Sequence, residues 1–170
     1  TSDEIVDMVR GEENSIVKIE FLRGQDIVSL DITRGIIANT AFGKMLENDV
    51  AFLEIYQFGT STATEVKQYL EVFKQANAKK IIVDLRDNGG GYLTSLEDVG
   101  SMFVPKDGIL IKQELTSGDA LVSKSTGNII LPFEEILILV NENTASAAEV
   151  FAIAVEENIG STIVGVLTYG

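Results

Sequence analysis

Residues 143–149, Asn-Thr-Ala-Ser-Ala-Ala-Glu, could carry nucleophilic chemistry through Ser146. The segment follows an apolar run and opens a stretch with helical spacing, and small residues on both sides leave the Ser146 hydroxyl uncrowded. A helix start presents unpaired backbone amides, which would stabilise an oxyanion formed beside that hydroxyl. The spacing also has a structural interpretation, because Ser146 and Glu149 fit a capping box. Spacing alone favours the cap.

Residues 84–91, Asp-Leu-Arg-Asp-Asn-Gly-Gly-Gly, form the second candidate segment, again after an apolar run. Three successive glycines permit positive φ and a close backbone approach to a ligand, so their amides could face an anion. The alternative is a flexible turn, which the glycines alone favour because they match no phosphate-loop pattern. Both segments follow apolar strands, and open α/β sheets place their ligand crevice at the carboxyl ends of strands.

Composition limits the base that could activate a serine. The 170 residues include no His and no Cys, which excludes a Ser-His-Asp triad, a Cys-His pair and an ordinary zinc site within the chain. A serine nucleophile would therefore need Lys or a carboxylate as its base. We expect no metal and no cofactor. The formal net charge of −13 disfavours binding to nucleic acid.

The elements that must position the two segments alternate along the chain, which predicts an α/β layered domain. The apolar character of residues 80–85 is typical of a strand in a sheet covered by helices. Thr62 and Glu65 fit a capping box at the start of one helix. Residues 117–128 are expected to form a polar loop or a loose hairpin. The expected strands are 50–58, 80–85, 108–115, 135–140 and 161–167, and the expected helices begin near 62, 94 and 145.

The first 35 residues have a different pattern. Residues 1–10 are expected to form a short helix with a capping box at Thr1 and Glu4, and residues 16–22 and 27–33 are expected to form a hairpin. One helix and one hairpin cannot bury a core, so residues 1–35 are expected to be the end of a domain. Residues 36–49 have no sustained period and are expected to be a connector to a core domain at 50–170.

Three segments carry a resemblance to the carboxyl-terminal processing (tail-specific) peptidases, which are S41-type serine proteases with a PDZ domain. Residues 83–91 resemble their "DLRxNxGG" segment, residues 140–150 resemble "VNxxTASASE", and residues 163–170 are similar to "VVGxxTYGKG". Residues 2–11 look like the last helix of the PDZ domain. The resemblance implies a layered crotonase/ClpP-like β-β-α protease core at 50–170, preceded by the carboxyl-terminal part of a PDZ domain at 1–35.

The resemblance implies a serine endopeptidase that uses a Ser–Lys dyad to hydrolyse peptide bonds near protein carboxyl termini. The roles it implies are Ser146 as nucleophile, the Ala147 amide with the Gly90 or Gly91 amide as oxyanion hole, Gly89, Gly90 and Gly91 as substrate-binding residues, and Glu157 as an acidic residue that affects activity. The substrates would have apolar carboxyl-terminal tails and lie in an extracytoplasmic compartment. A membrane anchor ahead of residue 1 is compatible with this interpretation.

The sequence also departs from the family pattern. The family lysine directly follows the Thr-Tyr-Gly segment, which here ends at Gly170, so residues 1–170 lack it and are expected to be inactive alone. Lys112 and Lys124 are other lysines, but nothing in the sequence places them near Ser146. Two alternatives remain open: a catalytically silent relative that serves as a binding or scaffold module, and a crotonase-like domain that binds an acyl ligand at the glycine turn.

Overall fold

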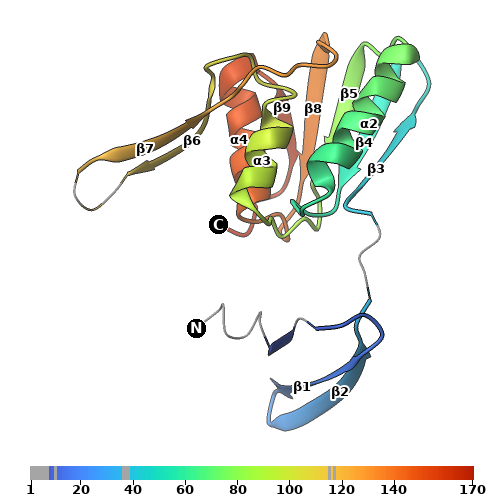
Figure 1. The fold of residues 1–170 in the computed structure, drawn as a ribbon, viewed down its shortest axis with the longest axis vertical. Coiled ribbons are helices and arrows are strands. Elements are labelled where there is room, and N and C mark those ends of the chain that lie inside the picture. Colours follow the sequence, from blue (N-terminus) through green and yellow to red (C-terminus); the bar gives the residue numbers. More distant parts are fainter. Residues whose placement is uncertain (1–7, 10, 36–38, 115, 117) are drawn as a thin grey trace. The chain divides into compact units, whose positions relative to one another are not determined.

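The computed structural model describes residues 8–9, 11–35, 39–114, 116 and 118–170 (Figure 1). The chain divides into two units, Thr1–Ala38 and Asn39–Gly170, and each is described by itself. In the first unit, strands β1 (Ile16–Arg23) and β2 (Asp26–Thr33) pair antiparallel, with Ile16 opposite Thr33. This pairing confirms the predicted hairpin. Most of the helix expected at residues 1–10, with its capping box at Thr1 and Glu4, lies outside the described residues.

One face of the hairpin is apolar except for the pair Arg23 and Asp26 next to the turn. The pairing register places six apolar side chains on this face: Val17, Ile19 and Phe21 of β1, and Val28, Leu30 and Ile32 of β2. All of them remain exposed or half-buried within the described unit. An isolated two-stranded hairpin is at best marginally stable in water. Assignment of this unit to a PDZ domain stays a prediction.

The second unit contains a five-stranded sheet in the order β3-β4-β5-β8-β9. Strand β3 pairs antiparallel with β4, and the other neighbouring strands are parallel. The strands are β3 (Ala41–Met45), β4 (Val50–Ile55), β5 (Lys80–Asp84), β8 (Glu135–Val140) and β9 (Thr162–Gly165). The predicted strands at 80–85 and 135–140 are confirmed within one residue, whereas β4 and β9 end earlier than expected.

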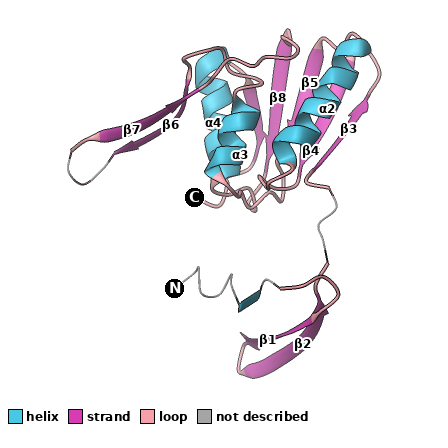
Figure 2. Cartoon of the chain, viewed as in Figure 1, coloured by secondary structure: helices cyan, strands magenta, loops and turns pink. Residues whose placement is uncertain are grey.

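Three helices lie over one face of this sheet (Figure 2): α2 (Thr62–Gln75), α3 (Leu93–Gly100) and α4 (Ala147–Ile159). The sheet residues beneath them are buried, among them Leu53, Val83 and Ile138 of the three central strands. Their neighbours Phe52, Ile82 and Leu137 point to the other face and are only half-buried. The predicted α/β layered architecture is confirmed, with the described helices on a single face.

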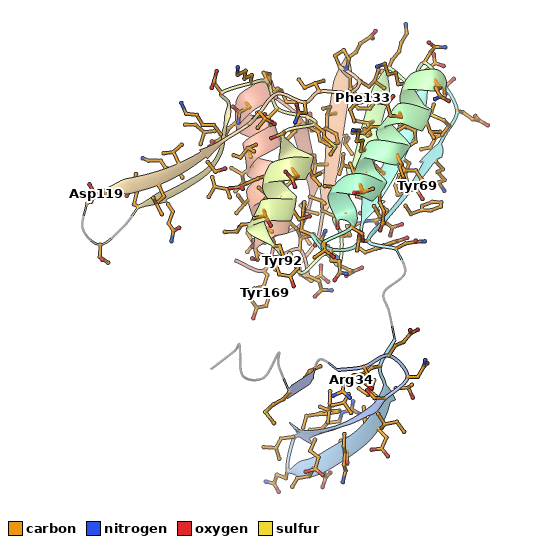
Figure 3. All side chains as sticks on the ribbon, in the orientation of Figure 1. Arg34, Tyr69, Tyr92, Asp119, Phe133 and Tyr169 are labelled. Carbon is orange, nitrogen blue, oxygen red and sulfur yellow. The ribbon has the colours of Figure 1, made fainter. Side chains whose placement is uncertain are left out.

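The connector expected at residues 36–49 is wrong for residues 41–45, which form edge strand β3. Gly43 weakened the strand pattern in the sequence because glycine is depleted in strands. The structure gives a packing reason for this glycine. A Cβ atom at Gly43 would lie 2.6 Å from Cδ1 of Tyr69 and 2.8 Å from Cζ of Phe73, both on α2. Tyr69 is labelled in Figure 3.

The capping box expected at Thr62 and Glu65 is also wrong. Ser61 is the N-cap residue of α2, and the Glu65 carboxylate instead accepts hydrogen bonds from the amides of Thr40 and Ala41, at 2.7 and 2.9 Å. Burial opposes the shift, but the hydrogen bonds from Ser61 and Thr40 lower the pKa of Glu65. Glu65 therefore anchors the start of β3 to α2, a contact between segments that sequence spacing does not indicate.

A second hairpin extends from the core (Figure 1). Its strands β6 (Ile109–Glu114) and β7 (Ala120–Lys124) pair antiparallel. The strand expected at 108–115 is thereby confirmed within one residue, and of the loop or loose hairpin expected at 117–128, residues 120–124 form the strand that pairs with it. At its base, the buried Ser125 hydroxyl donates a hydrogen bond to the carbonyl oxygen of Val104 at 2.6 Å. In the described part of the chain, no helix is long and apolar enough to cross a membrane.

Candidate active site

Ser146 occupies a strained turn between β8 and α4. Its φ of 54° and ψ of −121° lie outside the regions that ordinary residues adopt. The other described non-glycine residues with positive φ are all Asn or Asp, which tolerate that conformation: Asn14, Asn48, Asp49, Asn77, Asp87 and Asp107. A strained residue of this kind costs about 1–3 kcal/mol, and such residues cluster at functional sites.

The capping interpretation of Ser146 holds in part. The Ser146 amide donates a hydrogen bond to Oε2 of Glu149 at 2.7 Å, and the two residues form a capping box. An ordinary N-cap residue, however, has β-region dihedral angles and needs no positive φ. The Ser146 residue is also exposed. Capping therefore accounts for the helix start but leaves the strained, exposed turn unexplained, which favours the nucleophile interpretation.

The glycine turn lies directly against Ser146. Gly90 has a φ of 95°, and a Cβ atom built on it would lie 2.8 Å from Cβ of Ser146 and 2.9 Å from the amide nitrogen of Ala147. Gly91 has a φ of 143°, and its Cβ would overlap the carbonyl oxygen of Phe58. Gly89 is exposed and meets nothing within 4 Å. Close approach therefore requires glycine at positions 90 and 91, not at 89.

The backbone amides around this turn differ in whether they already have hydrogen-bond partners. Among the described residues, neither the Ala147 amide nor the Gly91 amide has a hydrogen-bond acceptor. The Gly90 amide is already engaged, because it donates to Oδ1 of Asn88 at 2.8 Å. Of the two glycine amides that the sequence left open, Gly91 therefore has the available donor.

Asn88 connects the segments around Ser146 by hydrogen bonds, although no sequence pattern indicated a separate role for it. It is fully buried, and its Nδ2 donates to the carbonyl oxygen of Ile55 at 2.7 Å. The backbone carbonyl oxygen of Asn88 accepts a hydrogen bond from the amide of Ala145 at 2.9 Å. With the bond to Gly90, Asn88 joins the end of β4, the glycine turn and the residue before Ser146.

Asp87 connects the same two segments at the surface. Its Oδ1 accepts hydrogen bonds from the side-chain amides of Asn143, at 2.8 Å, and Asn141, at 2.9 Å. These two bonds lower the pKa of Asp87, with Asn143 the larger cause. The Asp87 amide donates in return to Oδ1 of Asn141 at 2.9 Å. Asp87 is therefore ionised at neutral pH and fixes the strand end that leads to Ser146.

Thr144 should contribute measurably to the stability of this arrangement. Its buried hydroxyl donates to the carbonyl oxygen of Leu85 at 2.8 Å and accepts from the amide of Asn141 at 3.0 Å. We expect Thr144→Val to lower the free energy of unfolding by about 1–3 kcal/mol, because it leaves the Asn141 amide unpaired at the buried end of this turn. It also takes one hydrogen bond from the Leu85 carbonyl, which keeps the bond from the Asn88 amide. Urea unfolding would measure the change, with the exposed Thr64→Val as control. An equal effect of both substitutions would contradict this role.

The carboxyl-terminal segment lies beside the same turn. The amide of Tyr169 donates to the carbonyl oxygen of Thr144 at 3.0 Å, and the Thr168 hydroxyl donates to Oε1 of Glu149 at 2.6 Å. Tyr169 and Tyr92, which follows the glycine turn, are both labelled at the same end of the unit in Figure 3. All three segments that carry the sequence resemblance therefore meet at one place.

Glu157 lies away from this place. It follows Ser146 by eleven residues, near the far end of α4, which corresponds to roughly 16 Å along the helix axis. It lines a hollow of about 220 Å³ between α4 and β6, together with Lys112. At this distance Glu157 does not contact the atoms around Ser146 directly.

No base for Ser146 stands out among the described residues. Lys112 forms an ion pair with Glu114 at 3.0 Å, and Lys124 ends strand β7 of the extended hairpin. No lysine side chain in the described part of the chain hydrogen-bonds to residues 143–149. Those same described ranges contain no group of carboxylates placed to hold a metal ion.

This sheet, with a strained serine and a glycine turn at the carboxyl ends of its strands, has the fold of the S41 serine proteases. The photosystem II D1 C-terminal processing protease superimposes with a TM-score of 0.74 over 98% of this chain and 47% of its own, at 24% identity. A lipoprotein from Streptococcus agalactiae superimposes with a TM-score of 0.63 over 78% of this chain and 51% of its own, at 19% identity.

The sequence comparisons identify the family. The model of peptidase family S41 matches residues 49–170. The chain is 30% identical over 170 residues to the carboxy-terminal processing protease CtpA of Bacillus subtilis, and 31% identical over 171 residues to a probable CtpA-like serine protease of Staphylococcus haemolyticus. The chain therefore belongs to peptidase family S41. The alignments cover 99% of this chain but only 36% and 34% of these relatives, so the chain spans about a third of their length.

Proposed function

We propose that the chain carries the nucleophile and oxyanion hole of a serine endopeptidase of the carboxyl-terminal processing type. The observation that carries the proposal is the strained turn at Ser146. It packs closely on Gly90, and the neighbouring Ala147 amide has no hydrogen-bond acceptor among the described residues. A binding or scaffold module would have no use for a serine in this conformation, because an unstrained residue would maintain the fold at lower cost.

The proposed reaction is acyl transfer to water. The Ser146 oxygen attacks the peptide carbonyl carbon while a lysine accepts the hydroxyl proton. The amides of Ala147 and Gly91 hold the negative oxygen of the tetrahedral intermediate. Collapse of the intermediate breaks the C–N bond, and the departing amine takes the proton from the lysine. Water then hydrolyses the acyl-enzyme with the same lysine as base.

The family resemblance supplies the base. In the related peptidases the lysine directly follows the segment that matches Thr168, Tyr169 and Gly170, and this segment lies beside Ser146. A lysine acts as a base near neutral pH only when burial or a neighbouring positive charge lowers its pKa. The absence of His from the 170 residues is consistent with a lysine in this role.

The substrates we propose are proteins or peptides with apolar carboxyl-terminal tails in an extracytoplasmic compartment. The support comes from the similar proteins, which include CtpA of Bacillus subtilis and the photosystem II D1 protease, both named as C-terminal processing proteases. The resemblance of residues 2–11 to a PDZ helix adds to this proposal, because PDZ domains bind extended peptides along a strand edge.

Residues 1–170 alone are expected to cleave no peptide above the buffer background, since no lysine in them matches the family base. A chain extended beyond Gly170, with lysine at the next position, should cleave a quenched fluorescent peptide that has an apolar tail. The matched control is the extended chain with that lysine replaced by alanine, which should be inactive. Equal turnover by the short chain and the extended chain would refute the Ser–Lys proposal.

A further inference from the structure

The Glu149 carboxylate joins the turn at Ser146 to the segment 168–170, which lies 19 to 21 residues beyond Glu149 in the sequence. Its Oε2 accepts the Ser146 amide at 2.7 Å. Its Oε1 accepts the Thr168 hydroxyl at 2.6 Å and the Gly170 amide at 3.2 Å. One side chain therefore connects the strained serine with the end of the Thr-Tyr-Gly segment.

Glu149 is a poor candidate for the base itself. The hydrogen bond from Thr168 is the main cause that lowers the pKa of Glu149, the Gly170 and Ser146 amides add to it, and burial opposes the shift. An ionised carboxylate with a lowered pKa is a weak proton acceptor. Both of its oxygens are also occupied. The carboxylate alternative that the lack of His left open is thus disfavoured at Glu149.

The same contacts hold the backbone in place as far as the Gly170 amide. The Thr168 hydroxyl, the Tyr169 amide and the Gly170 amide are each bound, by Glu149, Thr144 and Glu149 respectively. The next Cα atom lies about 3.8 Å beyond that of Gly170. A residue at that position therefore starts from a backbone that is tied to the Ser146 turn through one carboxylate.

We propose that Glu149 is a positioning residue. Its carboxylate holds the Ser146 amide, and with it the strained turn, while it clamps Thr168 and Gly170 so that the base that follows them reaches the Ser146 hydroxyl. This inference rests on the proposed function, because it assumes that Ser146 is the nucleophile and that the residue after Gly170 is the base.

Two substitutions in the extended protein test the positioning role of Glu149. Glu149→Gln keeps an oxygen for Thr168 and Gly170, but its NH₂ group cannot accept the Ser146 amide. We expect kcat to fall about 10-fold to 100-fold with KM within about twofold, because small displacements of reacting groups cost rate rather than binding. Thr168→Val should lower kcat by less. The double variant should lose no more than Glu149→Gln alone, because both changes break the same connection.

The pH profile separates positioning from a merely structural role. Removing a negative charge near a lysine lowers the pKa of that lysine, so the acidic limb of kcat/KM should move to lower pH in Glu149→Gln. The matched control is Glu156→Gln on the exposed side of the same helix, which should change neither kcat nor the profile.

The possible outcomes separate this inference from the proposed function. Wild-type kcat and pH profile in both Glu149→Gln and Thr168→Val would overturn the positioning role, provided that Ser146→Ala in parallel is inactive. If Ser146→Ala keeps its activity, the proposed function falls as well. If Glu149→Gln melts below the assay temperature, the kcat of Thr168→Val decides, since the loss of one hydroxyl removes a single contact to Glu149: a lowered kcat supports the positioning role and a wild-type kcat overturns it.

Discussion

Ser146→Ala in the extended protein is expected to lower kcat/KM by about 10⁴-fold or more, the magnitude seen when a serine protease loses its nucleophile. The substitution removes the oxygen that would form the acyl-enzyme and leaves the backbone amides of the proposed oxyanion hole in place. KM should change little, and the loss of the N-cap hydroxyl should lower the free energy of unfolding by only about 1 kcal/mol, so the variant stays folded at the assay temperature. Peptide cleavage followed by fluorescence, together with a thermal melt, measures both quantities.

The control for this prediction is Ser123→Ala on β7, which lies on the extended hairpin and outside the turn around Ser146. It should retain wild-type kcat/KM. Activity of Ser146→Ala within tenfold of the wild type would contradict the nucleophile assignment. It would return Ser146 to the role of a helix cap, which the spacing of the sequence favoured.

Gly90→Ala should have the second largest effect, on both folding and activity. An alanine there would adopt a φ of 95° and press its Cβ against Ser146, Ala147 and the carbonyl oxygen of Ala145. We expect a loss of roughly 2–4 kcal/mol in the free energy of unfolding, from backbone strain together with overpacking. In the extended protein, displacement of the serine turn should lower kcat by about 100-fold.

Two other glycines separate these causes. Gly118 has a φ of 90° with nothing within 4 Å of its Cβ position, so Gly118→Ala measures the cost of positive φ alone. Gly89 has open space and no positive φ, so Gly89→Ala should leave the melting temperature nearly unchanged. Urea unfolding of the three variants gives the comparison. If Gly90→Ala were no more destabilising than Gly118→Ala, the close packing of Gly90 on Ser146 would be refuted.

Strong local patterns made most of the elements predictable. The hairpin at β1 and β2 was expected because two alternating runs flank a short turn with Gly24, which adopts a φ of 68°. Strands β5 and β8 were expected from uninterrupted apolar residues, and both match within a residue. Periods of 2 and 3.6 arise within one element, so they are visible without the partners of that element.

Elements that depend on distant partners were not predictable. Strand β3 contains Gly43, which disfavours a strand locally and is required only because Tyr69 and Phe73 of α2 lie against it. Glu65 sits at capping-box spacing but binds amides of residues 40 and 41 instead. A carboxylate accepts hydrogen bonds from whichever donors the tertiary fold brings near, and spacing alone does not identify them.

The candidate site shows the same division. Ser146, Gly90 and Gly91 were singled out from the sequence, whereas the buried Asn88 and the role of Glu149 beyond its own helix start were not. Asn88 appears in the sequence as one more polar turn residue, and only the fold shows that it is buried and bonded to three segments. The φ of Ser146, which decides against a simple cap, is a backbone property with no sequence signature.

Covalent labelling tests the central assignment most directly. The extended protein is treated with a fluorophosphonate, which reacts with activated serines, then digested and analysed by mass spectrometry. We expect one stoichiometric adduct, on the peptide that contains Ser146, formed in parallel with the loss of peptide cleavage. Loss of cleavage with the adduct on a different residue, or full labelling of Ser146 with cleavage undiminished, would contradict its role as the nucleophile.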